Sequence, residues 1–118
     1  MSNSFKRSER VADLIMKEVS NMIVMGEIKD PRVKSASITG VKVSDNLSVA
    51  EMFYTVVGED DYKQAVRNGL ESATGFIRNK LAARLKMRRI PELKFSYDVA
   101  LDKAYKLDDA LREIKDEQ

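Results

Sequence analysis

The chain has 118 residues, with 21 Lys and Arg against 19 Asp and Glu, and a formal net charge of only +2. That length fits one domain, and 43% hydrophobic with 34% charged residues predicts a modest core beneath a charged surface. Because the sequence contains neither Cys nor His, disulfides, thiolate nucleophiles, cysteine-ligated metals and imidazole bases are excluded.

The amino-terminal half predicts one helix followed by two strands. Apolar residues at three- and four-residue spacing predict an amphipathic helix over about 8–25, and Gly26 is placed to end it. Asp30-Pro31 predicts a turn, since proline disfavours a helical residue before it. A strand is expected over 36–43, with a bulge where the alternation slips at Gly40.

Turn residues at 44–46 separate that strand from a second one, predicted over 47–57. Apolar residues of both parities indicate an internal strand that is covered on part of both faces. Gly58 and the three carboxylates after it are expected to break this strand and to precede a helix.

The carboxyl-terminal half predicts a long helical region, a third strand and a short helix. One apolar stripe runs from Tyr62 to Leu85 and is expected to kink at Ala73-Thr74-Gly75, with Pro91 ending the helical region. A strand is predicted over 93–99, and a short terminal helix follows. The prediction is a single α+β domain over residues 1–118, with an acidic extension at 98–118.

The basic residues are concentrated in one part of the chain. Residues 62–97 hold nine basic and two acidic side chains, or +7, whereas residues 98–118 hold four and seven, or −3. Six basic residues between Gly75 and Pro91 occur without an acidic one, and on one continuous helix they would fall on two flanks: Arg78, Lys86, Arg89 and Lys80, Arg84, Arg88. A solvated helix usually interleaves both signs, so this pattern favours a polyanionic partner such as nucleic-acid phosphate.

Other chemistry receives weaker support. The carboxylates at 59–61 and 108–109 are explained more simply by helix capping than by a metal ion, so we expect no metal and no cofactor. The aromatic rings of Tyr54, Tyr62 and Phe95 are expected to pack in the core. No apolar run approaches the ~20 residues that cross a bilayer, and the first residues lack a secretory signal, which indicates a cytoplasmic protein without membrane contact.

Several short motifs occur in the chain in the order typical of the bacterial ribosome-binding factor A family, which the chain closely resembles over nearly its whole length. The motifs that carry the resemblance are Arg7-x-x-Arg10-Val11, Asp30-Pro31-Arg32, Val43-Ser44-Asp45-Asn46-Leu47-Ser48-Val49-Ala50, the helix-kink motif Ala73-Thr74-Gly75, Gly75-x-Ile77-Arg78-x-x-Leu81 and Met87-Arg88-Arg89-Ile90-Pro91-Glu92-Leu93-x-Phe95-x-x-Asp98.

The resemblance implies a type II KH-like fold of order α-β-β-α(kink)α-β with a short terminal helix. It also implies a non-enzymatic assembly factor, monomeric when free. Such a factor binds the small (30S) ribosomal subunit and 16S rRNA late in maturation, assists rRNA processing, contacts other assembly or initiation factors transiently and supports growth in the cold. Unlike ordinary KH domains, the chain lacks a Gly-x-x-Gly loop and has Ala73-x-Gly75 instead. Gly75 is expected to let the two half-helices pack or to admit an RNA phosphate.

We therefore expect rRNA phosphates to bind a surface made of these basic residues: Lys6, Arg7, Arg10, Arg78, Lys80, Arg84, Lys86, Arg88 and Arg89. Charge reversal at Arg84, Arg88 and Arg89 is expected to abolish subunit binding without loss of stability. Two alternatives stay open. One is a protein-interaction module that uses the 47–57 strand or the acidic tail, with the basic helix incidental, and the other is a small carboxylate-based hydrolase or transferase.

Overall fold

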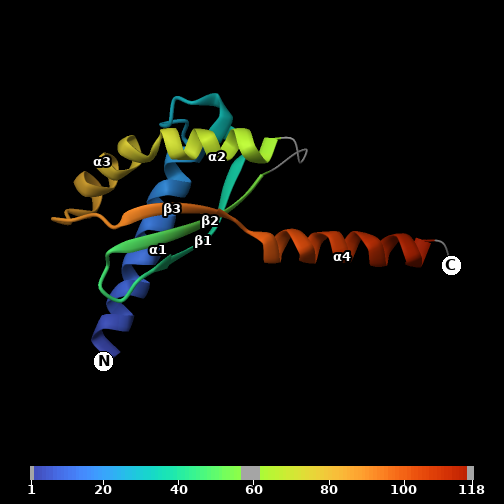
Figure 1. Ribbon diagram of the computed structural model, residues 1–118, viewed down its shortest axis with the longest axis horizontal. Coiled ribbons are helices and arrows are strands. Elements are labelled where there is room, and N and C mark those ends of the chain that lie inside the picture. Colours follow the sequence, from blue (N-terminus) through green and yellow to red (C-terminus); the bar gives the residue numbers. More distant parts are fainter. Residues whose placement is uncertain (1, 57–61, 117–118) are drawn as a thin grey trace.

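The computed structural model describes residues 2–56 and 62–116 and has a mixed α and β architecture (Figure 1). The predicted chain order is confirmed, whereas the predicted strand breaker at 58–61 lies outside the described residues. In chain order the elements are α1 (Ser2–Val24), the 3-10 helix η1 (Pro31–Ser35), β1 (Ala36–Val43), β2 (Val49–Val56), α2 (Lys63–Ser72), α3 (Thr74–Leu85), β3 (Glu92–Tyr97) and α4 (Val99–Asp116).

The three strands form one sheet in the order β1-β2-β3, with β1 antiparallel and β3 parallel to the central β2. Residues of one parity in β2, Ala50, Met52 and Tyr54, are buried beneath the helices. Val49 and Phe53, of the other parity, are half-exposed, so the strand is internal as predicted but fully covered on one face only.

Helix α1 supplies one side of the core. Ile15, Val19 and Met22 are completely buried, which confirms the predicted apolar stripe. The helix starts at Ser2 rather than near residue 8, because its first turns precede the stripe that marked it in the sequence. Gly26 ends the helix as predicted. Its φ of 68° is left-handed, and the N–H of Glu27 donates a hydrogen bond to the carbonyl of Met22.

The predicted bulge in β1 is confirmed, and it connects the sheet to the last helix. The register shifts between Ile38 and Gly40, which leaves Thr39 out of the ladder. The Thr39 hydroxyl donates to Asp98 Oδ2 over 2.7 Å, and the backbone N–H of Leu101 donates to Asp98 Oδ1 over 2.9 Å. These two hydrogen bonds, the Leu101 bond first, lower the pKa of Asp98. Asp98 therefore fixes the start of α4 to the bulge.

The kink predicted at Ala73-Thr74-Gly75 is confirmed, since α2 ends at Ser72 and α3 begins at Thr74. The glycine that packs closely is one turn earlier. A Cβ on Gly69 would lie 3.0 Å from both Arg32 Cβ and Val33 Cγ2, whereas a Cβ on Gly75 would meet nothing within 4 Å. Packing of the two half-helices therefore does not explain Gly75.

Replacing these two glycines is expected to have opposite effects on stability. Gly69→Ala should lower the free energy of unfolding by about 1–2 kcal/mol, because overpacking against Arg32 and buried Val33 outweighs the gain in helix propensity. Gly75→Ala should raise it by up to about 1 kcal/mol. Urea denaturation of both variants measures the difference, and an equal gain in both would contradict the close approach at Gly69.

The last helix, α4, is longer than the short helix predicted. It spans 18 residues and projects from the domain (Figure 1). The radius of gyration of 16.4 Å exceeds the ~13.5 Å of a compact chain of this length, as a projecting helix requires. Leu107, Leu111 and Ile114 are each more than half exposed and share one side of the helix. The extension is therefore an amphipathic helix without a covering element among the described residues.

Candidate nucleic-acid interface

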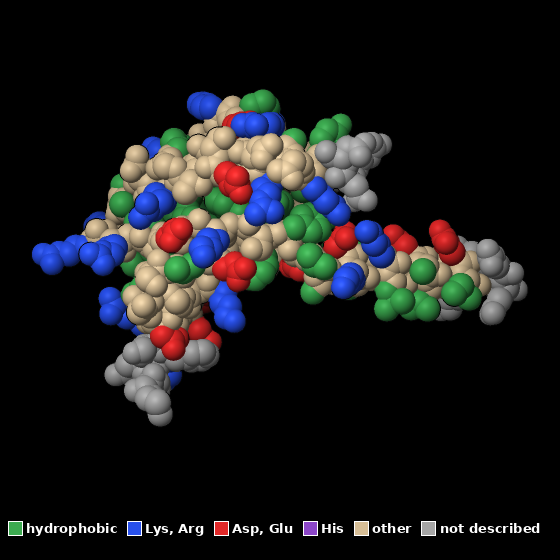
Figure 2. Space-filling model, viewed as in Figure 1, with side chains coloured by type: hydrophobic (Ala, Val, Ile, Leu, Met, Phe, Trp, Pro, Cys, Tyr) green, Lys and Arg blue, Asp and Glu red, His purple; other side chains and the backbone are tan. Residues whose placement is uncertain are grey.

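The predicted basic helix is shorter than its charge pattern suggested. Helix α3 ends at Leu85, because Lys86 adopts a left-handed conformation with φ 52°. Arg88 and Arg89 consequently lie in the loop between α3 and β3, and the prediction that they share helix flanks with Arg78 and Lys80 is wrong. Figure 2 shows Lys and Arg side chains gathered at the end of the domain that this loop forms.

Arg84 differs from the other predicted binding residues because it pairs with acidic side chains of its own chain. Its Nη1 lies 3.3 Å from Glu18 Oε2 in α1, and its Nη2 pairs with Glu27 Oε1 just beyond that helix. The exposed fraction of the Arg84 side chain is 30%. The hydrogen bond from Arg84 lowers the pKa of Glu27, and the same bond raises the pKa of Arg84.

Two other basic residues of α3 also make contacts within the chain, although both remain exposed. Arg78 Nη2 donates to the carbonyl of Ile90 over 3.0 Å, which holds the loop against the helix. Lys80 Nζ lies 5.5 Å from the centre of the Phe76 ring. These residues contribute positive charge to the surface while supporting its shape.

Three of the remaining predicted arginines line one cavity. Arg7 from α1 and Arg88 and Arg89 from the loop line an open space of about 520 Å³ together with the turn between β1 and β2. We call this space the basic cavity; its lining residues are Arg7, Asp45, Asn46, Leu47, Lys86, Met87, Arg88 and Arg89. Within the described ranges, none of the three arginines forms an ion pair or a hydrogen bond.

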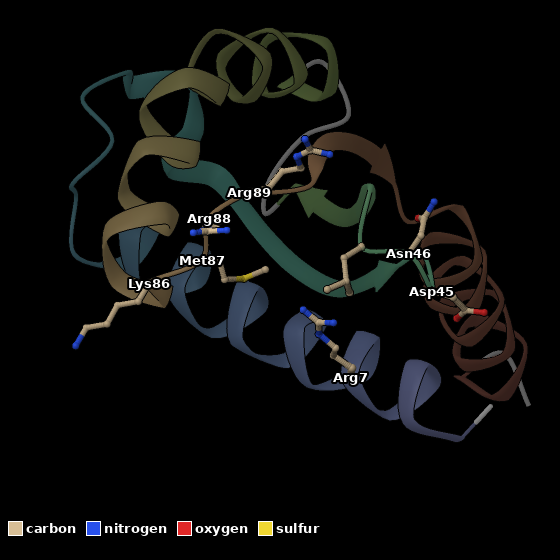
Figure 3. Close-up of a pocket in the computed structure, with 8 residues that line it drawn as sticks. Arg7, Asp45, Asn46, Lys86, Met87, Arg88 and Arg89 are labelled. Carbon is tan, nitrogen blue, oxygen red and sulfur yellow. The ribbon is translucent and has the colours of Figure 1, made fainter.

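The close-up of the basic cavity shows how its residues are directed (Figure 3). Arg7 and Met87 point toward the same space between α1 and the loop, whereas Lys86 points outward. Lys6 and Arg10 are exposed on α1 and do not line the cavity. The structure therefore brings together Arg7, Arg88 and Arg89 from the predicted set, although more than 75 residues of sequence separate the first from the other two.

Sequence reasoning missed the hairpin turn and Met87 as parts of this site. Leu47 adopts a φ of 60°, which would suit glycine or asparagine better, and the sequence alone does not show this conformation. No residue spacing indicated that this turn would face the loop at 86–89.

A second hollow, of about 420 Å³, lies on the other side of the loop. Gly75 lines it together with Arg78, Asn79, Ala82, Arg88, Arg89 and Ile90. Since a Cβ on Gly75 would meet nothing, the backbone at the kink is open to an approaching ligand.

Other predicted features fall outside this site. Tyr54 and Phe95 are buried as expected, whereas Tyr62 is exposed, so the prediction of a core role for Tyr62 is wrong. The residues that the structure describes contain no group of carboxylates arranged to hold a metal ion, and the carboxylates at 59–61 lie outside them. None of the described helices is long and apolar enough to cross a membrane.

Comparison with known proteins identifies the family. The family model described as Ribosome-binding factor A matches residues 7–111. This chain belongs to the ribosome-binding factor A family. It is 44% identical over 110 residues to the ribosome-binding factor A of Geotalea uraniireducens, a match that covers 93% of this chain and 89% of that protein. It is 43% identical over 114 residues to that of Geobacter sulfurreducens, covering 97% and 96%.

Solved structures of ribosome-binding factor A share the fold. The crystal structure from Thermus thermophilus matches with a TM-score of 0.65 at 21% identity, covering 76% of this chain and 94% of that one. The solution structure of a Thermotoga maritima protein, described as a putative ribosome binding factor A, matches with a TM-score of 0.58 at 20% identity, covering 77% and 82%. A third match is a Thermus thermophilus homology model fitted into the map of a 30S complex, with a TM-score of 0.53 at 24% identity, covering 70% and 90%.

Proposed function

We propose that this chain is a ribosome-binding factor of the small (30S) subunit that contacts 16S rRNA through the basic cavity and its surroundings. Membership of the ribosome-binding factor A family supports this proposal, as does the related Thermus thermophilus factor, which was fitted into a 30S complex. In the proposed role, the protein binds the small subunit late in the maturation of 16S rRNA, assists the processing of this RNA and is then released. This role includes growth in the cold. In this proposal the protein acts in the cytoplasm as a monomer and catalyses no reaction. It contacts other assembly or initiation factors transiently.

The proposed fold type is a type II KH-like module. Its support is the order of the elements, with the kinked pair α2 and α3 between the antiparallel strands and the parallel β3. The kink has Ala73-Thr74-Gly75 in place of a Gly-x-x-Gly loop. RNA recognition in this proposal therefore depends on the loop at 86–89 and on Arg7, not on a four-nucleotide clamp.

One observation carries the proposal: three arginines that form no ion pair with the described residues converge at the basic cavity from two distant parts of the chain. Like charges held together repel one another unless a polyanion neutralises them. Arg84 is different, because its charge is balanced by Glu18 and Glu27 within the fold. The three arginines of the cavity thus serve an external partner.

A salt series tests the proposed function. The protein should co-sediment with immature small subunits and not with large subunits. If about four phosphates are neutralised, one for each basic residue of the cavity, the slope of log affinity against log salt should be roughly −3 to −4. Binding that is equal for both subunits, or that does not change with salt, would contradict the proposal.

The alternative of a protein-interaction module gains support from α4, whose apolar side is exposed (Figure 2). Serine substitutions at Leu107, Leu111 and Ile114 discriminate between the two functions. Binding to small subunits and to naked 16S rRNA fragments should both survive these substitutions if the basic cavity binds the subunit. Loss of subunit binding with full retention of rRNA binding would instead assign the main contact to a ribosomal protein on α4.

A further inference from the structure

The basic cavity has a rim and a floor of different chemistry. Leu47 and Met87, which we call its floor, are half-buried and packed against the core, whereas the lining arginines, which we call its rim, are exposed. A surface that only follows a phosphate backbone needs cations and no apolar floor. Asp45, which also lines the cavity, would moreover repel a phosphate placed directly beside it.

The backbone at this cavity is held in an unusual conformation. Leu47, with φ 60°, and Lys86, with φ 52°, are the two non-glycine residues with positive φ in the described part of the chain, and both line the cavity. The left-handed conformation costs a non-glycine residue about 1 kcal/mol or more, and glycine would avoid this cost. Strained residues of this kind concentrate at functional sites. The leucine side chain at position 47 therefore serves the cavity rather than the turn.

The floor fits a flat, polarisable ligand. Leucine and methionine side chains offer an apolar surface, and the methionine thioether interacts favourably with aromatic rings. The cavity volume of about 520 Å³ falls in the usual range for sites that enclose small organic groups. At the rim, Asn46 uses its Oδ1 to accept from the N–H of Ser48 over 3.1 Å, so its amide N–H groups are the donors that the turn offers a ligand.

We propose that the basic cavity receives the base of one unpaired RNA nucleotide, while Arg7 and Arg88 hold the phosphate beside it. This proposal rests on the proposed function, since it names the part of the rRNA that the same site takes. The nucleotide must be unpaired, because a base inside a duplex is stacked and its faces are covered. The favoured substrate is a single strand or a bulge rather than a continuous helix.

The first test removes the floor and keeps every charge. Leu47→Gly deletes the side chain and relieves the strained backbone, so its melting temperature should stay close to that of the wild type. Its affinity for single-stranded RNA hexamers should fall about tenfold, as expected for the loss of one stacked base. The matched control is Ile23→Ala, which removes another half-buried aliphatic side chain that does not line the cavity and should leave RNA affinity unchanged.

The second test locates the base directly. The protein, with methionine methyl groups labelled with ¹³C and the Met87 signal assigned by Met87→Leu, is titrated with AMP, UMP, ribose 5-phosphate and inorganic phosphate. AMP and UMP should shift the Met87 methyl signal through ring currents, whereas ribose 5-phosphate and phosphate should not. Equal shifts with ribose 5-phosphate, or no shift with either nucleotide, would overturn the proposal.

The two proposals fail in different ways. If Leu47→Gly binds RNA and small subunits as the wild type does, while charge reversal at the rim abolishes binding, the nucleotide site is wrong and the ribosomal function stands. If the wild-type protein does not associate with small subunits at all, the proposed function itself is wrong.

Discussion

Reversing the charge of Arg7, Arg88 and Arg89 to glutamate together should abolish co-sedimentation with small subunits. The affinity should fall by about 100-fold or more. Each substitution removes a phosphate contact and adds a repulsive charge, and three lost contacts at moderate salt correspond to a loss of this size. The melting temperature should hardly change, because the three side chains are exposed and make no ion pair within the described residues.

The matched control changes the net charge equally at exposed positions that do not line the cavity. Lys34, Lys94 and Lys103 lie in η1, β3 and α4, and their reversal to glutamate should weaken binding by a few-fold at most, through the overall field. If this control loses as much affinity as the rim variant, binding depends on net charge and not on the basic cavity.

Arg84→Glu should affect stability rather than recognition, and more strongly than any other single charge reversal in this region. The substitution places a third carboxylate beside Glu18 and Glu27, where α3 contacts α1. The two attractive contacts are thereby replaced by repulsion among three neighbouring carboxylates. The melting temperature should fall by several degrees, whereas Arg88→Glu, at an exposed position in the loop, should leave it nearly unchanged. Similar values for both variants would contradict a structural role for Arg84.

The same ion pairs predict how stability depends on pH. Because Arg84 lowers the pKa of Glu27, this carboxyl stabilises the folded state fully above the ordinary pKa of glutamate. The contribution is lost as the pH falls through the lowered value. Glu27→Gln removes the titrating group, so its melting temperature should decline less steeply than that of the wild type on acidification. Parallel pH profiles would show that the pair contributes nothing to stability.

Local patterns in the sequence predicted most of the fold. The spacing of apolar residues located α1, α2 and α3, and the phase slip at Gly40 located the bulge, because each depends on residues close together in the chain. The end of α3 was not predictable in this way. It depends on Lys86, an ordinary helix-forming residue that adopts a left-handed conformation at the mouth of the cavity.

The site was predicted only in part, because its contacts are distant in sequence. The absence of acidic residues near Arg84 suggested an unpaired cation, yet its partners lie 57 and 66 residues away. Local charge counting cannot detect such pairs. For the same reason the sequence did not predict that the 44–48 turn approaches the loop at 86–89. This approach forms the cavity and supplies part of its apolar floor.

The hydrogen bonds of Asp98 secure only the beginning of α4. An isolated helix of 18 residues is marginal in water, and its later turns, lined by exposed Leu107, Leu111 and Ile114, draw no stability from the core. The far end of α4 is therefore governed by a helix–coil equilibrium of its own. A surface that covers the apolar side would shift that equilibrium toward the helix, so that contact and chain ordering would occur in one step.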